Sequence, residues 1–317
     1  MPEFFEQHFA QEEKKEEKSP EQIKEEKALL LAEEIKKIKE RMKKEGKTIE
    51  GYQRISALVQ EIKKIYEKEI IGWKKEGKLT EKDVLAEYQA GGIVRAANFS
   101  PEGDKVVIGS GDIGTACGEM IVLSLIEKDE KGKPKVLAEY QGLGWVNAAN
   151  FSPEGDKVVI GSGNRKMIVF SLIEKDKEGK PKVLAEYEAE GGVRAANFSP
   201  EGDKVVIGSD DGKMRVLSLI EKDKKGKPKV KVLAKYQAGG RVRAANFSPE
   251  GDKVVIGSGD GKMILLSLIE KDEEGKPKVL AEYQAAGGWV WVYAANFSPE
   301  GDKVVIGSND GKMRVIG

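Results

Sequence analysis

Very few residues of this chain could take part in catalysis or bind a metal. The sequence contains a single histidine, His8, and a single cysteine, Cys117. A cysteine nucleophile needs a base held beside it, and His8 lies in a highly charged N-terminal segment where nothing fixes its geometry. Near Cys117 only Asp112 and Glu119 could join a metal site, which is fewer ligands than such sites use. We therefore predict that the chain is not an enzyme and binds no metal or cofactor, and we interpret the turn around Cys117 as a loop insertion.

Two further patterns have simple structural explanations. Residues 109–114 match the motif G-x-G-x-x-G, but a predicted strand follows them where a dinucleotide site requires a helix, so we interpret them as a glycine-rich turn. An asparagine also recurs at one position of five similar segments, as Asn98, Asn150, Asn197, Asn246 and Asn296. These side chains either line a channel for an ion or small polar ligand, or bond to backbone and water between repeated units. We favour the second interpretation, because buried amides are normally satisfied in this way.

The residues best suited to binding a partner lie where the five similar segments differ. Just before a shared strand valine stand Ile93, Trp145, Gly192, Arg241 and Trp291, and just after it Arg95, Asn147, Arg194, Arg243 and Tyr293. Tryptophan, tyrosine and arginine are enriched at binding hot spots. We predict one contiguous patch with Trp291 and Tyr293 near Arg95; its members are Arg95, Trp145, Arg194, Arg241, Arg243, Trp289, Trp291 and Tyr293. The alternative is that the rings fill gaps between repeated units.

The elements that must position these residues are repeats. The sequence AANFSPEGDKVVIGS occurs five times without a substitution, beginning at Ala96, Ala148, Ala195, Ala244 and Ala294. Each period of about 50 residues predicts four strands separated by turns, and repeats of this length in a β-rich unit are typical of propeller blades. The Pro-Glu-Gly-Asp turn never changes. We see no folding reason for identity at exposed turn positions, and we attribute it to recent duplication or deliberate copying.

Three segments are expected: a disordered or frayed charged segment at 1–18, a helical hairpin at 19–83 and five blades at 84–317. Apolar residues recur at helical spacing in the second segment, and a glycine-containing link there favours an antiparallel hairpin. Apolar groups off that stripe predict self-association through the hairpin. The lone strand at 84–90 is predicted to pair with the last strand near 312–316, because neither has another partner in its own repeat. This exchange would close a ring of twenty strands and leave no exposed edge.

The segment VRAANFSPEGDKVVIGSDDGKMRVLSL, from Val193 to Leu219, resembles a WD repeat, and the similarity extends over all five units. The resemblance implies a mainly β fold, a five-bladed β-propeller of four-stranded blades, and says little about activity. The family's third-strand tryptophan is replaced here, for example by Leu217, and its Gly-His pair is absent. We therefore expect that the family's buried polar network does not form. The tight-turn acid persists, as Asp112, Asp211, Asp260 and Asp310.

Composition argues against several kinds of partner. The chain has 54 basic and 54 acidic residues, so attraction of the whole molecule to nucleic acid or to an anionic membrane is not expected. It lacks a secretory signal and an apolar run that could span a bilayer, and with one cysteine we expect a cytoplasmic location. We predict a non-catalytic scaffold that binds a protein or peptide through the variable loops. The alternatives are a designed or duplicated structural repeat protein without a ligand, and a carbohydrate-binding propeller, which is disfavoured because only copies two and five carry loop aromatics.

Overall fold

The computed structural model describes residues 84–112, 118–220, 229–285 and 290–317, together with single helical positions between 30 and 58. The chain divides into two compact units, Met1–Asp83 and Val84–Gly317, which are described separately.

In the first unit, the described residues are helical. Arg54 Nη2 lies 2.9 Å from Glu34 Oε1, so an ion pair joins two helical positions that are 20 residues apart. Leu58 is buried, whereas Leu30 is exposed. The charged segment predicted at 1–18 and most of the hairpin predicted at 19–83 lie outside the described residues, so the antiparallel arrangement stays a prediction.

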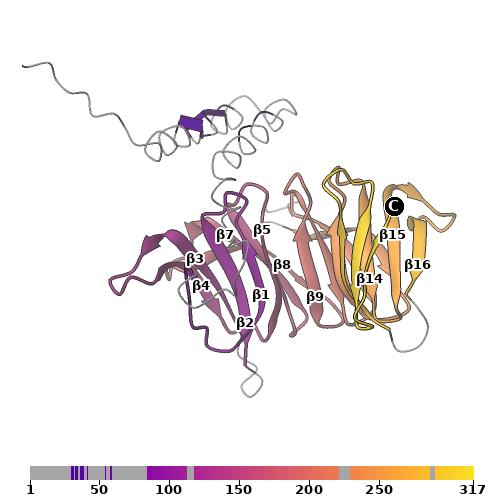
Figure 1. Cartoon of the computed structure of the whole chain (residues 1–317), viewed down its shortest axis with the longest axis horizontal. Helices are drawn as coiled ribbons and strands as arrows, with labels where there is room; N and C mark the ends of the chain where they lie inside the picture. Colours follow the sequence, from indigo (N-terminus) through magenta and orange to yellow (C-terminus); the bar gives the residue numbers. More distant parts are fainter. Residues whose placement is uncertain are drawn as a thin grey trace, which may run out of the picture. The chain divides into compact units, whose positions relative to one another are not determined.

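In the second unit, the described residues form nineteen strands in five antiparallel sheets (Figure 1). The first sheet contains β1 (Ile93–Phe99), β2 (Lys105–Gly111), β3 (Gly118–Lys128) and β4 (Pro134–Gln141). The second contains β5 (Val146–Phe151), β6 (Lys157–Ser162), β7 (Lys166–Lys175) and β8 (Pro181–Glu188). The third contains β9 (Val193–Phe198), β10 (Lys204–Ser209), β11 (Lys213–Ser218) and β12 (Lys231–Gln237). The fourth contains β13 (Val242–Phe247), β14 (Lys253–Ser258), β15 (Lys262–Lys271) and β16 (Pro277–Gln284), and the fifth β17 (Val292–Phe297), β18 (Val304–Ser308) and β19 (Met313–Ile316).

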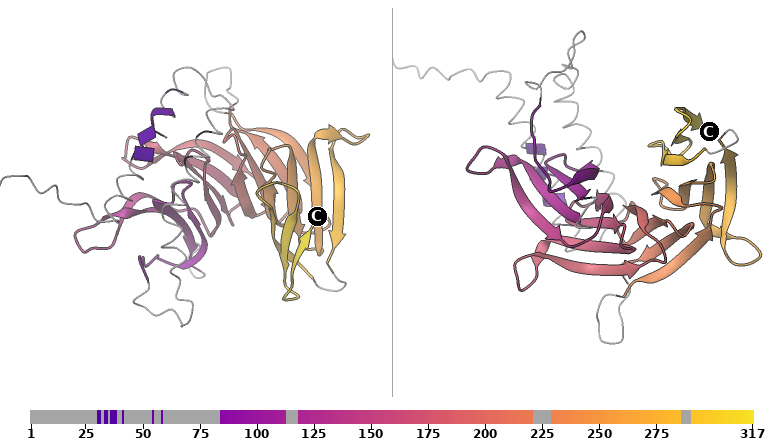
Figure 2. Two further views of the ribbon diagram at one scale, coloured as in Figure 1. Left: turned by 45° about the horizontal axis from the view of Figure 1, so that its top comes forward. Right: turned by 90° about the horizontal axis from the view of Figure 1, so that it is seen from below.

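The sheets follow one another in an arc (Figure 2). Within each sheet the strands lie in sequence order, as expected for a meander. The first strands β1, β5, β9, β13 and β17 lie on the inside of the arc, each in contact with the next. Alternating valine, isoleucine, methionine and alanine side chains from neighbouring sheets form the buried clusters between them. The mainly β architecture of repeated antiparallel sheets predicted from the sequence is confirmed.

One close contact joins every pair of neighbouring sheets. The buried Val146 of the second sheet lies against Gly109 of the first, and its Cγ1 is 2.4 Å from where a Cβ at Gly109 would stand. The equivalent distances are 2.6 Å at Gly161, 2.6 Å at Gly208 and 2.7 Å at Gly257. No side chain fits in that space, so glycine in the second strand allows the sheets to approach.

A hydrogen bond from the recurring asparagine accompanies this contact. Asn98 Nδ2 donates to the carbonyl oxygen of Ala149 in the next sheet at 2.9 Å. The same bond recurs three times along the arc, from Asn150 to Ala196, from Asn197 to Ala245 and from Asn246 to Ala295. Four of the five asparagines therefore bond to backbone between repeated units, which confirms the favoured interpretation for these four residues.

The predicted closure of the ring is not made in this structure. Residues 84–90 form no strand, and among the described residues β19 pairs only with β18, so the fifth sheet has three strands instead of four. Figure 2 shows the first and fifth sheets at opposite ends of the arc. Met313 of β19 is accordingly 68 % exposed, whereas its counterparts Met167, Met214 and Met263 are buried. The physical reason is the spacing of the sheets, because five of them at this curvature leave the last strand away from 84–90.

Part of the invariant turn has a folding explanation, which corrects our expectation for three of its positions. Ser100 Oγ donates to Asp104 Oδ1 at 2.7 Å and accepts a bond from the Lys105 backbone N–H at 3.0 Å. Gly103 between them has φ 73°, which disfavours any residue with a side chain. All five copies of the turn repeat these two bonds. Serine, glycine and aspartate are therefore required by the turn itself.

Candidate functional site

The variable residues lie on the loops that lead from one sheet into the first strand of the next. In four of the five copies a buried valine anchors the strand on the preceding sheet, as Val146 and Val193 do. The residues on either side of this valine are more exposed than it is. The loops are equivalent in the repeat, so they all lie at the same end of the arc. Three groups of contacts hold the variable side chains.

The first group joins the first and second sheets. The guanidinium carbon Cζ of Arg95 lies 4.7 Å from the centroid of the Trp145 ring, which is a cation–π contact. Trp145 Nε1 donates to the Asp112 carbonyl oxygen at 2.7 Å, so the ring is fixed on the loop of the first sheet. Trp145 is half-buried and Arg95 is exposed. The indole is therefore neither a free surface group nor a core residue.

The second group joins the third and fourth sheets. Arg194 forms a two-pronged ion pair with Asp210, with Nε–Oδ1 at 3.0 Å and Nη2–Oδ2 at 2.7 Å. Arg241 Nε lies 3.7 Å from Asp210 Oδ1 and its side chain is largely exposed. The carboxylate of Asp210 therefore faces two guanidinium groups, and Arg241 is the one that remains accessible to solvent.

The third group joins the fourth and fifth sheets. Arg243 Cζ lies 4.9 Å from the ring centroid of Trp291 and 4.8 Å from that of Tyr293. The two rings are 6.1 Å apart and inclined at 71°. The Nε of Arg243 is buried and has no hydrogen-bond partner among the described residues. Trp291 is half-buried and Tyr293 exposed, so the cation lies against two neighbouring rings that still reach solvent.

The structure thus places seven of the eight predicted residues in three local groups; Trp289 lies outside the described residues. The predicted approach of Trp291 and Tyr293 to Arg95 does not occur, because the first and fifth sheets lie at opposite ends of the arc (Figure 2). Where the other copies carry an arginine or a tyrosine just after the strand valine, the second copy carries Asn147. Its Nδ2 donates to the carbonyl oxygen of Val193 in the third sheet at 3.0 Å.

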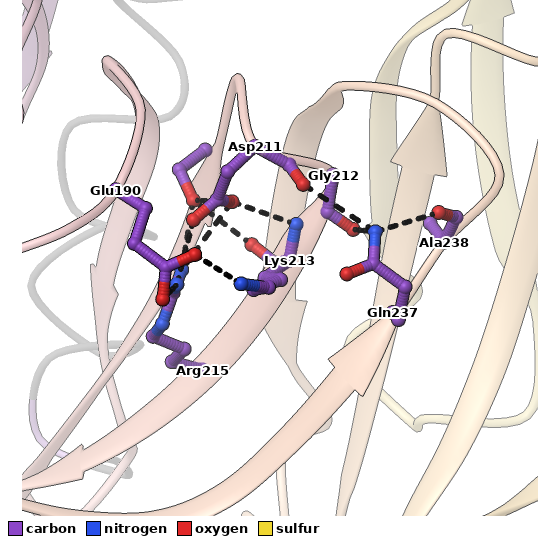
Figure 3. Close-up of polar contacts among 8 residues, drawn as sticks. Glu190, Asp211, Gly212, Lys213, Arg215, Gln237 and Ala238 are labelled. Carbon is purple, nitrogen blue, oxygen red and sulfur yellow. Dashed lines mark hydrogen bonds and ion pairs between the residues drawn. The ribbon is translucent and has the colours of Figure 1, made fainter.

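Sequence reasoning missed a buried arginine in the third sheet (Figure 3). Arg215 is only 2 % exposed, and its guanidinium donates to Asp211 Oδ2 at 2.6 Å and to Ser209 Oγ at 3.0 Å. Burial raises the pKa of Asp211, but the hydrogen bonds from Arg215 and Ser209 outweigh it and lower that pKa below its ordinary value. Glu190 pairs with Lys213 and lies 3.7 Å from Arg215.

Arg314, Asp310 and Ser308 repeat this arrangement in the fifth sheet. A partly buried polar network therefore forms without the family's tryptophan and histidine. The sequence feature that could have indicated this network is Lys-Met-Arg in copies three and five, where the second and fourth copies have Lys-Met-Ile.

A cavity of about 530 Å³ lies inside the arc, at the other end of the first strands from the variable loops. The five copies line it with the same types of residue, an asparagine, a phenylalanine and a proline each. Phe99 at its edge is 68 % exposed. Because all copies contribute alike, the cavity offers a surface of mixed polarity without a distinguishing group.

The described residues show neither of two other kinds of site. No three histidine, cysteine, aspartate or glutamate side chains among them are grouped so that they could hold a metal ion. A search of the same residues finds no helix with the length and apolar character to cross a membrane.

Comparisons with known proteins agree with this geometry. Residues 181–218 and 278–316 match the family model described as WD domain, G-beta repeat. No curated protein matches the sequence. A crystal structure of Chaetomium thermophilum Sqt1 bound to the N-terminus of the ribosomal protein L10 is 22 % identical, with a TM-score of 0.53, over 70 % of this chain and 58 % of that chain. A second structure of Sqt1 from the same organism is 20 % identical, with a TM-score of 0.55, over 72 % of this chain and 57 % of that chain.

The chain therefore spans less than two thirds of the length of these two structures. At these identities the likeness concerns the fold. It agrees with the repeated sheets and with the two segments that match the family model. The resemblance predicted from the sequence is confirmed: this chain carries WD repeats, and the described residues of its second unit form a WD-repeat-like β-propeller arc.

Proposed function

We propose that this protein is a non-catalytic scaffold that binds a protein or peptide on the face formed by its variable loops. The observation that carries the proposal is Arg243, whose cation lies against the rings of both Trp291 and Tyr293 and whose buried Nε has no hydrogen-bond partner among the described residues. A buried donor without a partner is unfavourable, and a ligand oxygen would satisfy it. Sqt1, which has a similar fold, has been crystallised with the N-terminus of a ribosomal protein, so a peptide segment is a ligand that this kind of fold can hold.

The chemistry of the three groups favours a peptide that carries both carboxylates and apolar side chains. Arg95 and Arg241 present exposed guanidinium groups, which bind carboxylates in a bidentate manner. Arg194 is not available in the same way because Asp210 already neutralises it. The half-buried indoles of Trp145 and Trp291 offer rigid apolar area that a ligand could cover at low entropic cost.

Two alternatives remain as outcomes of the test. In a structural repeat protein without a ligand, the cation–π contacts would serve only to bridge sheets, and no peptide would bind. In a carbohydrate-binding propeller, stacking on Trp145 and Trp291 would suffice, and the arginines would contribute little. Self-association through residues 19–83 and a cytoplasmic location likewise remain expectations from the sequence.

The experiment is a binding assay of the full chain against an array of peptides in which acidic and apolar residues alternate, with uncharged apolar peptides beside them. Arg243→Ala and Tyr293→Ala should each weaken binding of the acidic peptides by about tenfold or more, as expected for hot-spot residues. Phe99→Ala is the matched control, because it removes an exposed aromatic ring at the opposite end of a first strand. Loss of binding in Phe99→Ala with no change in the loop variants would move the site to the internal cavity and overturn the proposal.

A further inference from the structure

The two ends of the arc carry the two halves of the contact that joins its sheets. Within the arc, each sheet offers its successor a glycine and an asparagine, and receives from it a valine and an alanine carbonyl group. The fifth sheet still offers Gly307 and Asn296, and the first sheet still offers Val94 and the carbonyl group of Ala97. Val94 is 47 % exposed, whereas its counterparts in the other four sheets are buried.

The surroundings of Gly307 show that the fifth sheet's half of this glycine–valine contact has no partner in the part of the chain that the structure describes. A Cβ at Gly307 would meet only the Cβ of Ala294, at 3.6 Å, among the described residues. At the equivalent Gly208, a Cβ would stand 2.6 Å from Val242 Cγ1 and 2.9 Å from the Val242 carbonyl oxygen. The space that a valine of the next sheet occupies elsewhere is therefore open at Gly307.

At the other end of the arc, residues 84–90 likewise lack a neighbouring strand among the described residues. Ala90 is buried against Ile108 and Ile121 of the first sheet, where the fourth strand of a preceding sheet would lie. Gln89 Nε2 donates to the Ala90 carbonyl oxygen at 3.1 Å, as Gln237 does to Ala238 at 3.1 Å at the end of β12. The end of the segment thus occupies the position of a fourth strand, but no third strand lies beside it, and Leu85 is 94 % exposed.

The missing third strand corresponds to β19, which itself lacks a fourth strand. In the third sheet β11 pairs with β12 so that Arg215 is opposite Lys235 and Val216 opposite Ala234. By the repeat, the same register would set Arg314 opposite Glu87 and Val315 opposite Ala86. In that register opposite charges would face each other, where the third sheet has like charges, and Met313 and Val315, which are exposed in the single chain, would be covered.

The same chain does not bring these halves together. The four internal contacts use the same atoms, so they set one angle between neighbouring sheets, and five sheets at that angle leave the ends apart (Figure 2). We propose that a second copy of this chain supplies the missing half, with its first sheet and residues 84–90 docked on the fifth sheet of its neighbour. Such head-to-tail contacts are heterologous, so they build a larger ring if the rotation closes and a filament if it does not.

The first experiment measures the mass of the full chain by light scattering over a wide range of protein concentration. We expect the mass to rise with concentration, and Gly307→Val to associate less than the wild type at every concentration while its circular dichroism spectrum stays unchanged. A Cβ at Gly307 makes only an ordinary contact in the free chain, and a valine there would block the incoming Val94. A wild-type chain that is monomeric throughout would overturn the proposal. Association as strong in Gly307→Val as in the wild type would overturn it as well, since another surface would then be responsible.

A second experiment identifies the contact and separates it from closure within one chain. In a Cys117→Ser background, Val94→Cys and Gly307→Cys are made in separate chains, mixed and oxidised. Covalent dimers are expected, because the Cβ positions at Gly208 and Val242 would be 3.1 Å apart, and a small separation of the two sheets brings them to the roughly 3.5–4.5 Å of a disulfide. Gly208→Cys with Val242→Cys in one chain is the matched control, which should cross-link internally. If the chain carrying both end substitutions forms only an internal disulfide and no dimer, the arc closes on itself and the proposal is wrong.

Discussion

Replacing Gly208 with alanine is expected to destabilise the arc, whereas the same change at Gly307 is not. Both glycines stand in the sequence Val-Val-Ile-Gly-Ser, and neither has a positive φ, so alanine fits the backbone at both positions. Substitution removes the same conformational freedom from the unfolded chain in both variants, which favours the folded state by about 0.4–1 kcal/mol. This contribution cancels when the two variants are compared with each other.

The difference between the variants therefore reports the clash in the folded state alone. At Gly208 the new methyl group would stand 2.6 Å from Val242 Cγ1 and 2.9 Å from a carbonyl oxygen, so the third and fourth sheets must move apart. Overpacking of this kind costs about 1–3 kcal/mol. At Gly307 the methyl group meets one carbon at 3.6 Å, which is an ordinary contact. We expect Gly307→Ala to be about 1–3 kcal/mol more stable than Gly208→Ala.

The assay is urea unfolding followed by tryptophan fluorescence, in dilute protein so that contacts between chains do not contribute. Thermal unfolding should show the same order, with a separation of about 2–4 °C for each kcal/mol in a domain of this size. Equal destabilisation in the two variants would refute the reasoning, because it would mean that Gly307 is covered by a neighbouring sheet of the same chain.

Three further outcomes are expected from the contacts described above. Asn197→Ala should cost about 1 kcal/mol of unfolding free energy by urea titration, since it removes the bond to Ala245, whereas Asn296→Ala, which lacks that bond, should cost much less. Arg215→Ile should be tolerated better than Arg215→Ala in thermal unfolding, because the fourth sheet already carries Ile264 at this position and alanine would leave a cavity worth about 2 kcal/mol or more. Burial raises the pKa of Asp156, but hydrogen bonds from Lys157 and Ser152 outweigh this effect, so the pKa in the folded protein is lowered. The carboxylate therefore stabilises the fold above the ordinary aspartate pKa of about 4, and this contribution is lost as the pH falls through the lower folded value. Urea midpoints should therefore fall below about pH 4, and Asp156→Asn should reduce that dependence.

The repeated sheets could be predicted from the sequence because local signals agreed within every copy. Strands alternate with Pro-Glu-Gly-Asp turns, and the glycine of each turn has the positive φ that the pattern implies. The segment 84–90 shows the limit of this approach. It carries the same Val-Leu-Ala-Glu-Tyr-Gln as β4, yet it forms no strand, because a strand needs a hydrogen-bonded neighbour and none lies beside it.

The candidate site could be predicted by residue type but not by its pairing. That Arg95 and Trp145 stand on variable loops follows from comparing the copies. That they stack on each other depends on the angle between two sheets, which no short stretch of sequence specifies. The burial of Arg215 could not be predicted either. An arginine in a strand is expected at the surface unless the acceptors of its hydrogen bonds are known.

The glycine–valine contact between sheets also bears on how this chain can misfold. Because its atoms are the same at every interface, Val146 would fit Gly208 as well as it fits Gly109, and nothing in the packing itself distinguishes the correct neighbour from a wrong one. Only the short links between sheets, such as the four residues between Glu188 and Val193, bring the correct strands together first. During refolding at high concentration the correct partner in one chain therefore competes with equivalent partners in others, a form of misassembly characteristic of repeat proteins. Lengthening one of these links would weaken that kinetic advantage without touching any contact of the folded arc.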